Sequence, residues 1–406
     1  MAAHLCRHWR SYTSSEIQDF DDAAEKLLDF IRSDVRGRII RRFPYRRLIH
    51  QWGRTRFLTE SYKKLYRDTD AEEDAPPRPT LHVLATNLTN GCLWSFDEEH
   101  LKIYDADECM SFTTPSIGIG TKIGASSAFP GFFPPMRFRA SDLGLDQRDF
   151  QPAEQFVTDG GVYDNLGIRR ARLLVDESAQ EQRPISLVLI SDAGAAFDLS
   201  SSRKLGLFGT AMRSADILME RIGRVDLEVA GWRDTRAEGS SLSGIYQVAS
   251  IKAEIRREED PHATNEDLQR SLKFIRTDFD HFSDFEILCL VAHGYCVTRR
   301  LIRGLVGLSP SESIGDADRE AFQREVAVIP DCAPWCPSSV TTSCSILKQR
   351  DHRGSIALRR IQRARKRRLR LFNVRDYMTY VNVLALVVVI AAPFFVERCF
   401  RLPIPV

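Results

Sequence analysis

The spacing of apolar side chains predicts a helical amino-terminal part. Over residues 20–35, apolar positions recur every three or four residues, which is the pattern of one face of an amphipathic helix. A second stretch with this period, richer in basic residues, covers 54–66. Two further helices are expected over 205–222 and 284–305 on the same grounds.

Continuous apolar runs predict buried strands. The segments "LHVLATNL" (81–88) and "PISLVLISDAG" (184–194) are too short and too apolar for surface helices. Between them, "EQFVT" (154–158) predicts a short strand that enters a turn, and 168–174 predicts a helix that leaves it. Apolar strands separated by helices are typical of a parallel sheet covered on both faces. We therefore predict an α/β protein with a mostly parallel sheet.

Changes in composition divide the chain. An acidic segment broken by prolines, "DTDAEEDAPPRPT" (68–80), separates the amino-terminal helices from the apolar strands. The expected parts are a helical unit, an acidic linker, an α/β core, a second linker with a basic block, and an apolar helix: residues 1–67, 68–80, 81–305, 306–376 and 377–396.

The carboxyl-terminal part predicts a membrane anchor. Residues 377–396 carry no charge, and twenty helical residues span about 30 Å, the thickness of a bilayer core. The block Arg359 to Arg370, with eight basic residues in twelve, comes before this segment. We expect one transmembrane helix, a catalytic part on the cytoplasmic side, and contact of the basic block with anionic lipid rather than nucleic acid. A buried core helix is the alternative.

Composition gives little support for a highly charged partner, a disulfide framework, a zinc site or secretion. The 406 residues have a formal net charge of +2, which indicates no particular class of partner. Nine cysteines at irregular spacings, without a C-x-x-C pair, favour neither a disulfide framework nor a zinc site. The first residues, "MAAHLCRHWRSY", lack the apolar core of a signal peptide.

One short stretch, "FVTDGGVYDNLGIRRA" (156–171), concentrates residues suited to chemistry. Asp159 follows a predicted strand, and Gly160 and Gly161 allow close approach of other backbone. A carboxylate at the end of a strand, in a turn that leads to a helix, is well placed for proton transfer. An ordinary surface loop is the alternative.

Three segments of the sequence, taken in their order along the chain, place this turn in a wider pattern. They are "LHVLATNLTNGCLWSF" (81–96), "IGASSAFPGFFPP" (123–135) and the turn at Asp159. Together they resemble the carboxyl-terminal two-thirds of a patatin-like phospholipase domain, over about residues 1–300. This resemblance implies a three-layer α/β/α fold and hydrolysis of lipid acyl esters without a metal or an organic cofactor.

The resemblance also implies roles for individual residues. Asp159 corresponds to the aspartate of a Ser-Asp dyad, which takes the proton of the serine hydroxyl and returns it to the leaving alcohol. Burial at the turn should raise its pKa and make it a better base. Gly160 and Gly161 would let the backbone bend without blocking the nucleophile. Three aromatic side chains would line an apolar wall for acyl chains, or belong to the core: Phe129, Phe132 and Phe133.

The nucleophile expected for such a dyad is absent from the sequence. No G-x-S-x-G elbow occurs, and Gly160–Gly161 is the one Gly-Gly pair, so the glycine-rich oxyanion loop is absent too. Residues 2–12 have the character of the helix that follows an elbow. We therefore expect a hydrolase whose nucleophile lies before Met1. A catalytically inactive, membrane-tethered protein that binds lipid or a partner is the alternative.

Other polar residues are expected to be structural. Asp164 and Asn165 are predicted to form the turn by bonding local backbone. His82 and His293 lie beside apolar residues and are expected to be core histidines. Ser126 and Ser127, in the second block, are expected to lie where a helix packs closely on the sheet.

Overall fold

The computed structural model describes most of the chain. The described residues are 1–42, 53–66, 79–105, 108–114, 117–130, 132–196, 207–229, 245–260, 263–275, 281–307, 358–363 and 376–400. The predicted linker 68–80 lies almost entirely outside these ranges, as do most of 306–376 and residues 364–370 of the basic block.

The larger sheet is curled, has six strands and is antiparallel throughout. Its spatial order is β4-β3-β2-β1-β6-β5, and every neighbouring pair is antiparallel. The strands are β1 (Val83–Asn87), β2 (Leu93–Phe96), β3 (His100–Asp105), β4 (Glu108–Thr113), β5 (Met136–Arg139) and β6 (Glu154–Asp159). Within the described ranges, a second sheet consists of β7 (Val188–Asp192) and β8 (Tyr246–Ser250), which are parallel.

The predicted three-layer α/β/α fold with a mostly parallel sheet is therefore wrong. The apolar segment 81–88 does contain a strand, but this strand pairs at once with the chain that follows it. The connection contains Gly91, whose φ of 78° is a conformation that glycine adopts without strain. A short connection of this kind joins antiparallel strands, whereas parallel strands need a long crossover.

The strands that the prediction missed carry a recognisable alternation. In β3, Leu101 and Ile103 are buried while Lys102 and Tyr104 are partly exposed. This period of two is typical of an antiparallel strand with one face on the core. On the core face, the ring of the fully buried Trp94 lies 5.7 to 5.9 Å from the rings of three phenylalanines: Phe96, Phe138 and Phe150.

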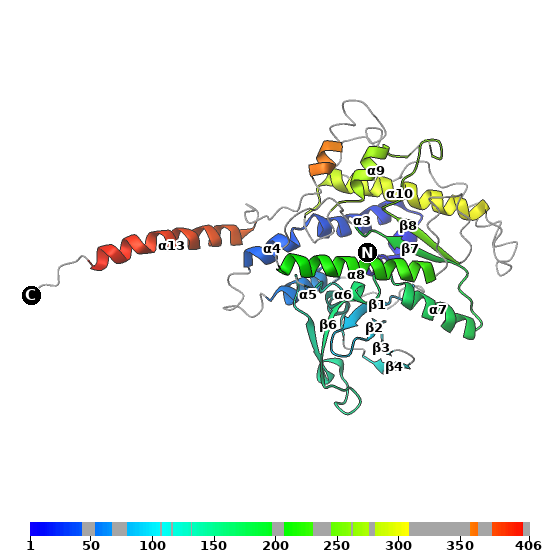
Figure 1. Cartoon of the computed structure of the whole chain (residues 1–406), viewed down its shortest axis with the longest axis horizontal. Coiled ribbons are helices and arrows are strands. Elements are labelled where there is room, and N and C mark those ends of the chain that lie inside the picture. Colours follow the sequence, from blue (N-terminus) through cyan, green and yellow to red (C-terminus); the bar gives the residue numbers. More distant parts are fainter. Residues whose placement is uncertain are drawn as a thin grey trace, which may run out of the picture.

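Helices pack on both sheets. They are α1 (Ala2–Arg7), α2 (Trp9–Thr13), α3 (Ile17–Arg32), α4 (Val35–Arg42), α5 (Arg54–Leu65), α6 (Ile119–Ser126), α7 (Ile168–Gln180), α8 (Leu207–Val229), α9 (Glu266–Leu272) and α10 (Asp284–Gly307). Helices α5 and α6 pack on each other, and α6 packs on β1 and β6. Ile168 of α7, Ile190 of β7 and Leu227 of α8 form a separate small core. Helices α9 and α10 lie on the opposite side of the molecule from β2, β3 and β4 (Figure 1).

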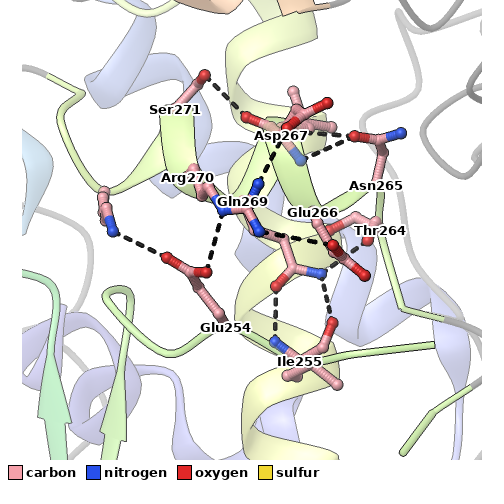
Figure 2. Close-up of polar contacts among 11 residues, drawn as sticks. Glu254, Ile255, Thr264, Asn265, Glu266, Asp267, Gln269, Arg270 and Ser271 are labelled. Atoms are coloured by element: carbon pink, nitrogen blue, oxygen red, sulfur yellow. Dashed lines mark hydrogen bonds and ion pairs between the residues drawn. The ribbon is translucent and has the colours of Figure 1, made fainter. Parts of the chain in front are cut away.

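A buried glutamine joins α9 to the chain after β8. Its amide oxygen accepts the N–H of Ile255 over 2.8 Å, and its amide nitrogen donates to the carbonyls of Ile255 and Thr264, as Figure 2 shows for Gln269. Asn265 caps α9 by accepting the N–H of Asp267. Because backbone groups occupy the glutamine amide, this network is structural.

The last helix, α13 (Tyr377–Phe400), covers the segment predicted to span a membrane. That prediction, and the membrane location drawn from it, is wrong: in the part of the chain that the structure describes, no helix combines the length and the apolar content needed to cross a bilayer. The sequence pattern did not reveal that the start of α13 is tied to the protein. Met378 and Thr379 are buried, and the Asn382 amide donates to the Arg41 carbonyl of α4 over 3.0 Å. Beyond this contact α13 extends away from the rest of the molecule (Figure 1).

The described start of the basic block also packs on the protein. Ile361 is buried against Leu268, Leu272 and Leu288, while Arg359, Arg360 and Arg363 are exposed. Contact of the whole block with anionic lipid remains a prediction.

Candidate functional site

Asp159 lies where β6 ends and a single 3₁₀ turn, η5 (Gly160–Val162), begins. Its Oδ1 accepts the N–H of Gly161 over 2.7 Å, so the carboxylate caps the turn. In the register, Asp159 lies opposite Ala85 of β1, and cross-strand partners point to the same face of a sheet. Asp159 therefore lies at the end of β6, on the same face of the sheet as the core residue Ala85.

The backbone of Asp159 is held from two sides. Its N–H donates to the carbonyl of Ala128 over 3.3 Å, and its carbonyl accepts the hydroxyl of Thr86 over 2.8 Å. The Thr158 hydroxyl also donates to the Ala128 carbonyl, over 2.6 Å. The aspartate is thus fixed between β1 and the end of α6, as a positioned base must be.

The two glycines after Asp159 both lie against close neighbours, which differ in kind. A Cβ at Gly160 would lie 2.4 Å from the backbone oxygen of Leu84, and one at Gly161 would lie 2.9 Å from Oδ1 of Asn165. Neither glycine has a positive φ. Gly160 is therefore required because the backbone of β1 passes so near, and not because of an unusual backbone conformation, whereas the atom nearest to a Cβ at Gly161 belongs to a side chain.

The electrostatic environment makes Asp159 a stronger base than a free aspartate. Burial raises the pKa of its carboxyl to about 6, and the hydrogen bond from Gly161 opposes the rise. The side chain remains partly exposed. At neutral pH the group is largely ionised and has a proton affinity close to that of a general base suited to this pH.

Two hydroxyls form a hydrogen-bonded pair where α5 packs on α6. The Tyr62 hydroxyl of α5 donates to Oγ of Ser127, at the end of α6, over 3.1 Å. Burial raises the pKa of Tyr62, and the negative charge of Asp159 raises it further. No sequence signal links Tyr62 to Asp159, because the two residues are 97 positions apart and only folding brings them together.

The three predicted wall residues differ in position. Phe133 is buried in the main core, and Phe129 and Phe132 pack against that core with their rings 6.2 Å apart. The last two remain partly exposed. A role in holding an acyl chain stays a prediction for all three.

Other predicted residues take structural positions. Asp164 accepts the backbone N–H of Arg170 over 3.1 Å, as expected of a residue that forms the turn. His293 is buried, and one ring nitrogen lies 3.2 Å from the carbonyl of Ile251. Burial lowers its pKa, so it is a neutral core histidine at pH 7.

The site thus consists of a carboxylate with a fixed backbone and a raised pKa. Within the described ranges, no group of three or more His, Cys, Asp or Glu side chains is arranged to hold a metal ion. Comparison of the chain with protein-family models, curated proteins and solved structures gives no match.

Proposed function

We propose that this protein hydrolyses acyl esters, with lipids as the substrate class and Asp159 as the general base. The observation that carries the proposal is the combination of a fixed backbone, partial exposure and a pKa of about 6 at Asp159. A carboxylate held only to shape a turn gains nothing from a raised pKa, since burial then only destabilises its charged form.

In the proposed reaction, Asp159 accepts the proton of a hydroxyl as its oxygen attacks the ester carbonyl. The tetrahedral intermediate then expels the alcohol, which takes the proton back from Asp159 and leaves an acyl group on the attacking oxygen. Water attacks this acyl group by the same proton transfers and releases the acid. The carboxylate is regenerated, and no oxidant or cofactor takes part.

The resemblance of three sequence blocks to patatin-like phospholipases supports the proposal. The antiparallel sheet differs from the sheet of that family, so the support is limited to the blocks and does not include the architecture. The sequence contains no G-x-S-x-G motif. Ser127, which is hydrogen-bonded to Tyr62, is the first hydroxyl to test as the nucleophile.

The experiment is a hydrolysis assay of fluorogenic esters with short and long acyl chains, from pH 5 to pH 8. We expect the wild-type rate to rise with pH through about 6, as Asp159 ionises. The variant Asp159→Asn should lower the rate by about 100-fold or more, the usual contribution of a general base. Asp149→Asn changes an exposed aspartate and should leave the rate unchanged.

Two further variants locate the hydroxyl. Loss of activity in Ser127→Ala, with a smaller loss in Tyr62→Phe, would identify Ser127 as the nucleophile. Absence of turnover by the wild-type protein on every ester, or an equal rate in Asp159→Asn, would contradict the proposed hydrolysis and favour a non-catalytic lipid-binding or interaction protein.

A further inference from the structure

The small parallel sheet ends in a hydrogen-bonded pair of polar side chains. Asp192 is the last residue of β7 and Ser250 is the last residue of β8, and the register of the two strands places them side by side. The Ser250 hydroxyl donates to Oδ2 of Asp192 over 2.8 Å. In open sheets with parallel strands, ligands bind outside the carboxyl ends of the strands, which is where this pair lies.

Asp192 is held in place by its neighbours. It is 8% exposed, its Oδ1 accepts the N–H of Gly194 over 3.0 Å, and its backbone carbonyl accepts the N–H of Ile251 over 2.8 Å. The chain that follows β7 is anchored as well, because the N–H of Ala196 donates to the carbonyl of Lys273, the residue after α9, over 2.6 Å. A base fixed in this way keeps its geometry during proton transfer.

The hydrogen bonds around Ser250 orient its hydroxyl. Its Oγ accepts the backbone N–H of Lys252 over 3.2 Å, and its own hydrogen is donated to Asp192. Because a serine hydroxyl has one hydrogen and two lone pairs, one lone pair stays available for attack on a carbonyl carbon. Ser250 is partly exposed, so the pair lies at the surface of the protein rather than in its core.

A lysine supplies a positive charge beside the pair. The ammonium of Lys252 lies 3.5 Å from Oδ2 of Asp192 and 3.3 Å from Oε2 of Glu220 in α8. The guanidinium of Arg224 lies 3.6 Å from the other oxygen of Glu220, so each carboxylate has a cationic partner. An ammonium close to the oxygen that accepts the serine hydrogen is also placed to stabilise the negative charge that an attacked carbonyl develops.

We propose that Ser250 is a nucleophile, with Asp192 as its general base, and that it accepts the acyl group of small, uncharged esters. Nucleophilic catalysis needs a nucleophile within hydrogen-bond distance of a base, and a third group that orients the base. Here Gly194 and Lys252 orient the carboxylate. The pair belongs to the two-stranded sheet and Asp159 to the six-stranded sheet, so the proposal does not depend on the function proposed for Asp159.

In the proposed step, Asp192 takes the hydroxyl proton of Ser250 while Oγ forms a bond to the carbonyl carbon of the ester. The tetrahedral intermediate then breaks its bond to the leaving oxygen, which takes the proton from Asp192 and departs as the alcohol. The acyl group stays on Ser250. Water attacks this group through the same proton transfers, which releases the acid and restores the hydroxyl.

The test is covalent labelling of the full chain with a small fluorophosphonate, which forms an Oγ–P bond with a nucleophilic serine and releases fluoride and the hydroxyl proton. Peptide mapping by mass spectrometry identifies the labelled residue. We expect the label on Ser250, at a rate about 100-fold lower in Asp192→Asn, because an amide cannot act as the base. Ser111→Ala changes an exposed serine of β4 and should be labelled like the wild type.

Ser250→Ala should lose the label, and thermal unfolding checks that this variant folds. A wild-type protein without label on Ser250 would contradict the proposal, whether or not the alanine variant folds. An equal labelling rate in Asp192→Asn would contradict it too, since Asp192 would then not be the base. Label on Ser250, together with ester hydrolysis that Asp159→Asn does not change, would support this proposal and contradict the function proposed for Asp159.

Discussion

Arg41 of α4 and Asp376, the residue before α13, form a buried ion pair across 335 positions of sequence. Nε of Arg41 donates to Oδ2 of Asp376 over 2.8 Å, and Nη1 of Arg41 donates to Asp34 over 3.0 Å. Burial by itself would raise the pKa of Asp376, but the hydrogen bond from Arg41 outweighs it and holds this pKa below its usual value. The pair connects the start of α13 to the amino-terminal helices.

Removal of this buried carboxylate should destabilise the protein. In Asp376→Ala, the buried guanidinium of Arg41 loses one of its carboxylate partners and keeps Asp34. A buried charge with fewer partners is costly, so the expected loss of unfolding free energy is about 3 kcal/mol. Urea unfolding measures it. Asp29→Ala breaks an ion pair whose carboxylate is 78% exposed, and should cost about 0.5 kcal/mol or less. Equal losses in the two variants would show that the buried pair contributes no more than a surface pair.

A methyl group at Gly160 should strain the turn that holds Asp159. The added Cβ would lie 2.4 Å from a backbone oxygen of β1, which cannot move without disturbing the sheet. We expect Gly160→Ala to destabilise the protein by about 1–3 kcal/mol. Gly118→Ala adds the same group where no atom lies within 4 Å, and should change the stability little. Thermal unfolding of both variants compares them, and similar melting temperatures would disprove the steric explanation.

Asp159 should make the stability depend on pH in a defined direction. Its folded-state pKa of about 6 lies above the ordinary value of 3.8, so the folded protein binds this proton more tightly than the unfolded chain does. Below about pH 4 both states are protonated and burial of the group costs little. The cost grows as pH rises through about 6 and is then constant, at about 3 kcal/mol.

Asp159→Asn removes this charge, and the amide oxygen of the asparagine should still accept the N–H of Gly161. The variant should therefore be more stable than the wild type at pH 7, and this advantage should disappear near pH 4. Chemical unfolding at several pH values measures the difference in unfolding free energy. A difference that does not change with pH would show that Asp159 has an ordinary pKa.

His4 should make the folded protein less stable as the pH falls, whereas Asp159 makes it more stable. It is fully buried, one ring nitrogen lies 2.8 Å from the carbonyl of Ala23, and burial lowers its pKa to about 4. The unfolded chain binds a proton below about pH 6.5, while the folded protein resists it. Stability should fall by about 3 kcal/mol between pH 6.5 and pH 4.

The variant His4→Gln keeps a donor at the same place and cannot titrate. Its stability should fall less than that of the wild type over this pH range, by chemical unfolding. His100→Gln changes a histidine whose side chain is 42% exposed and should follow the wild-type curve. If the two variants lose stability equally in acid, burial of His4 is not the cause.

The candidate site was predictable only in part. Asp159 stands out in the sequence because a carboxylate followed by two glycines leaves a predicted strand. Burial at the turn was expected to raise its pKa, and the pKa is raised to about 6. The electrostatic influence of Asp159 on Tyr62 of α5 was not predictable, because 97 positions separate the two residues. The contact between the Arg170 guanidinium of α7 and the Tyr104 ring of β3 was missed for a similar reason, because each of these elements looks like an ordinary surface element until the two are placed together.

The sequence by itself determined where most helices form and that residues 81–88 contain a strand, because both depend on the spacing of apolar side chains over a few residues. Only the tertiary structure decided the direction in which β1 pairs, the burial of Arg41 against Asp376, and the attachment of α13 to α4. These features depend on contacts between distant segments. The free energy that stabilises these contacts comes from the burial of side chains and the pairing of polar groups, which exist only once the chain has folded.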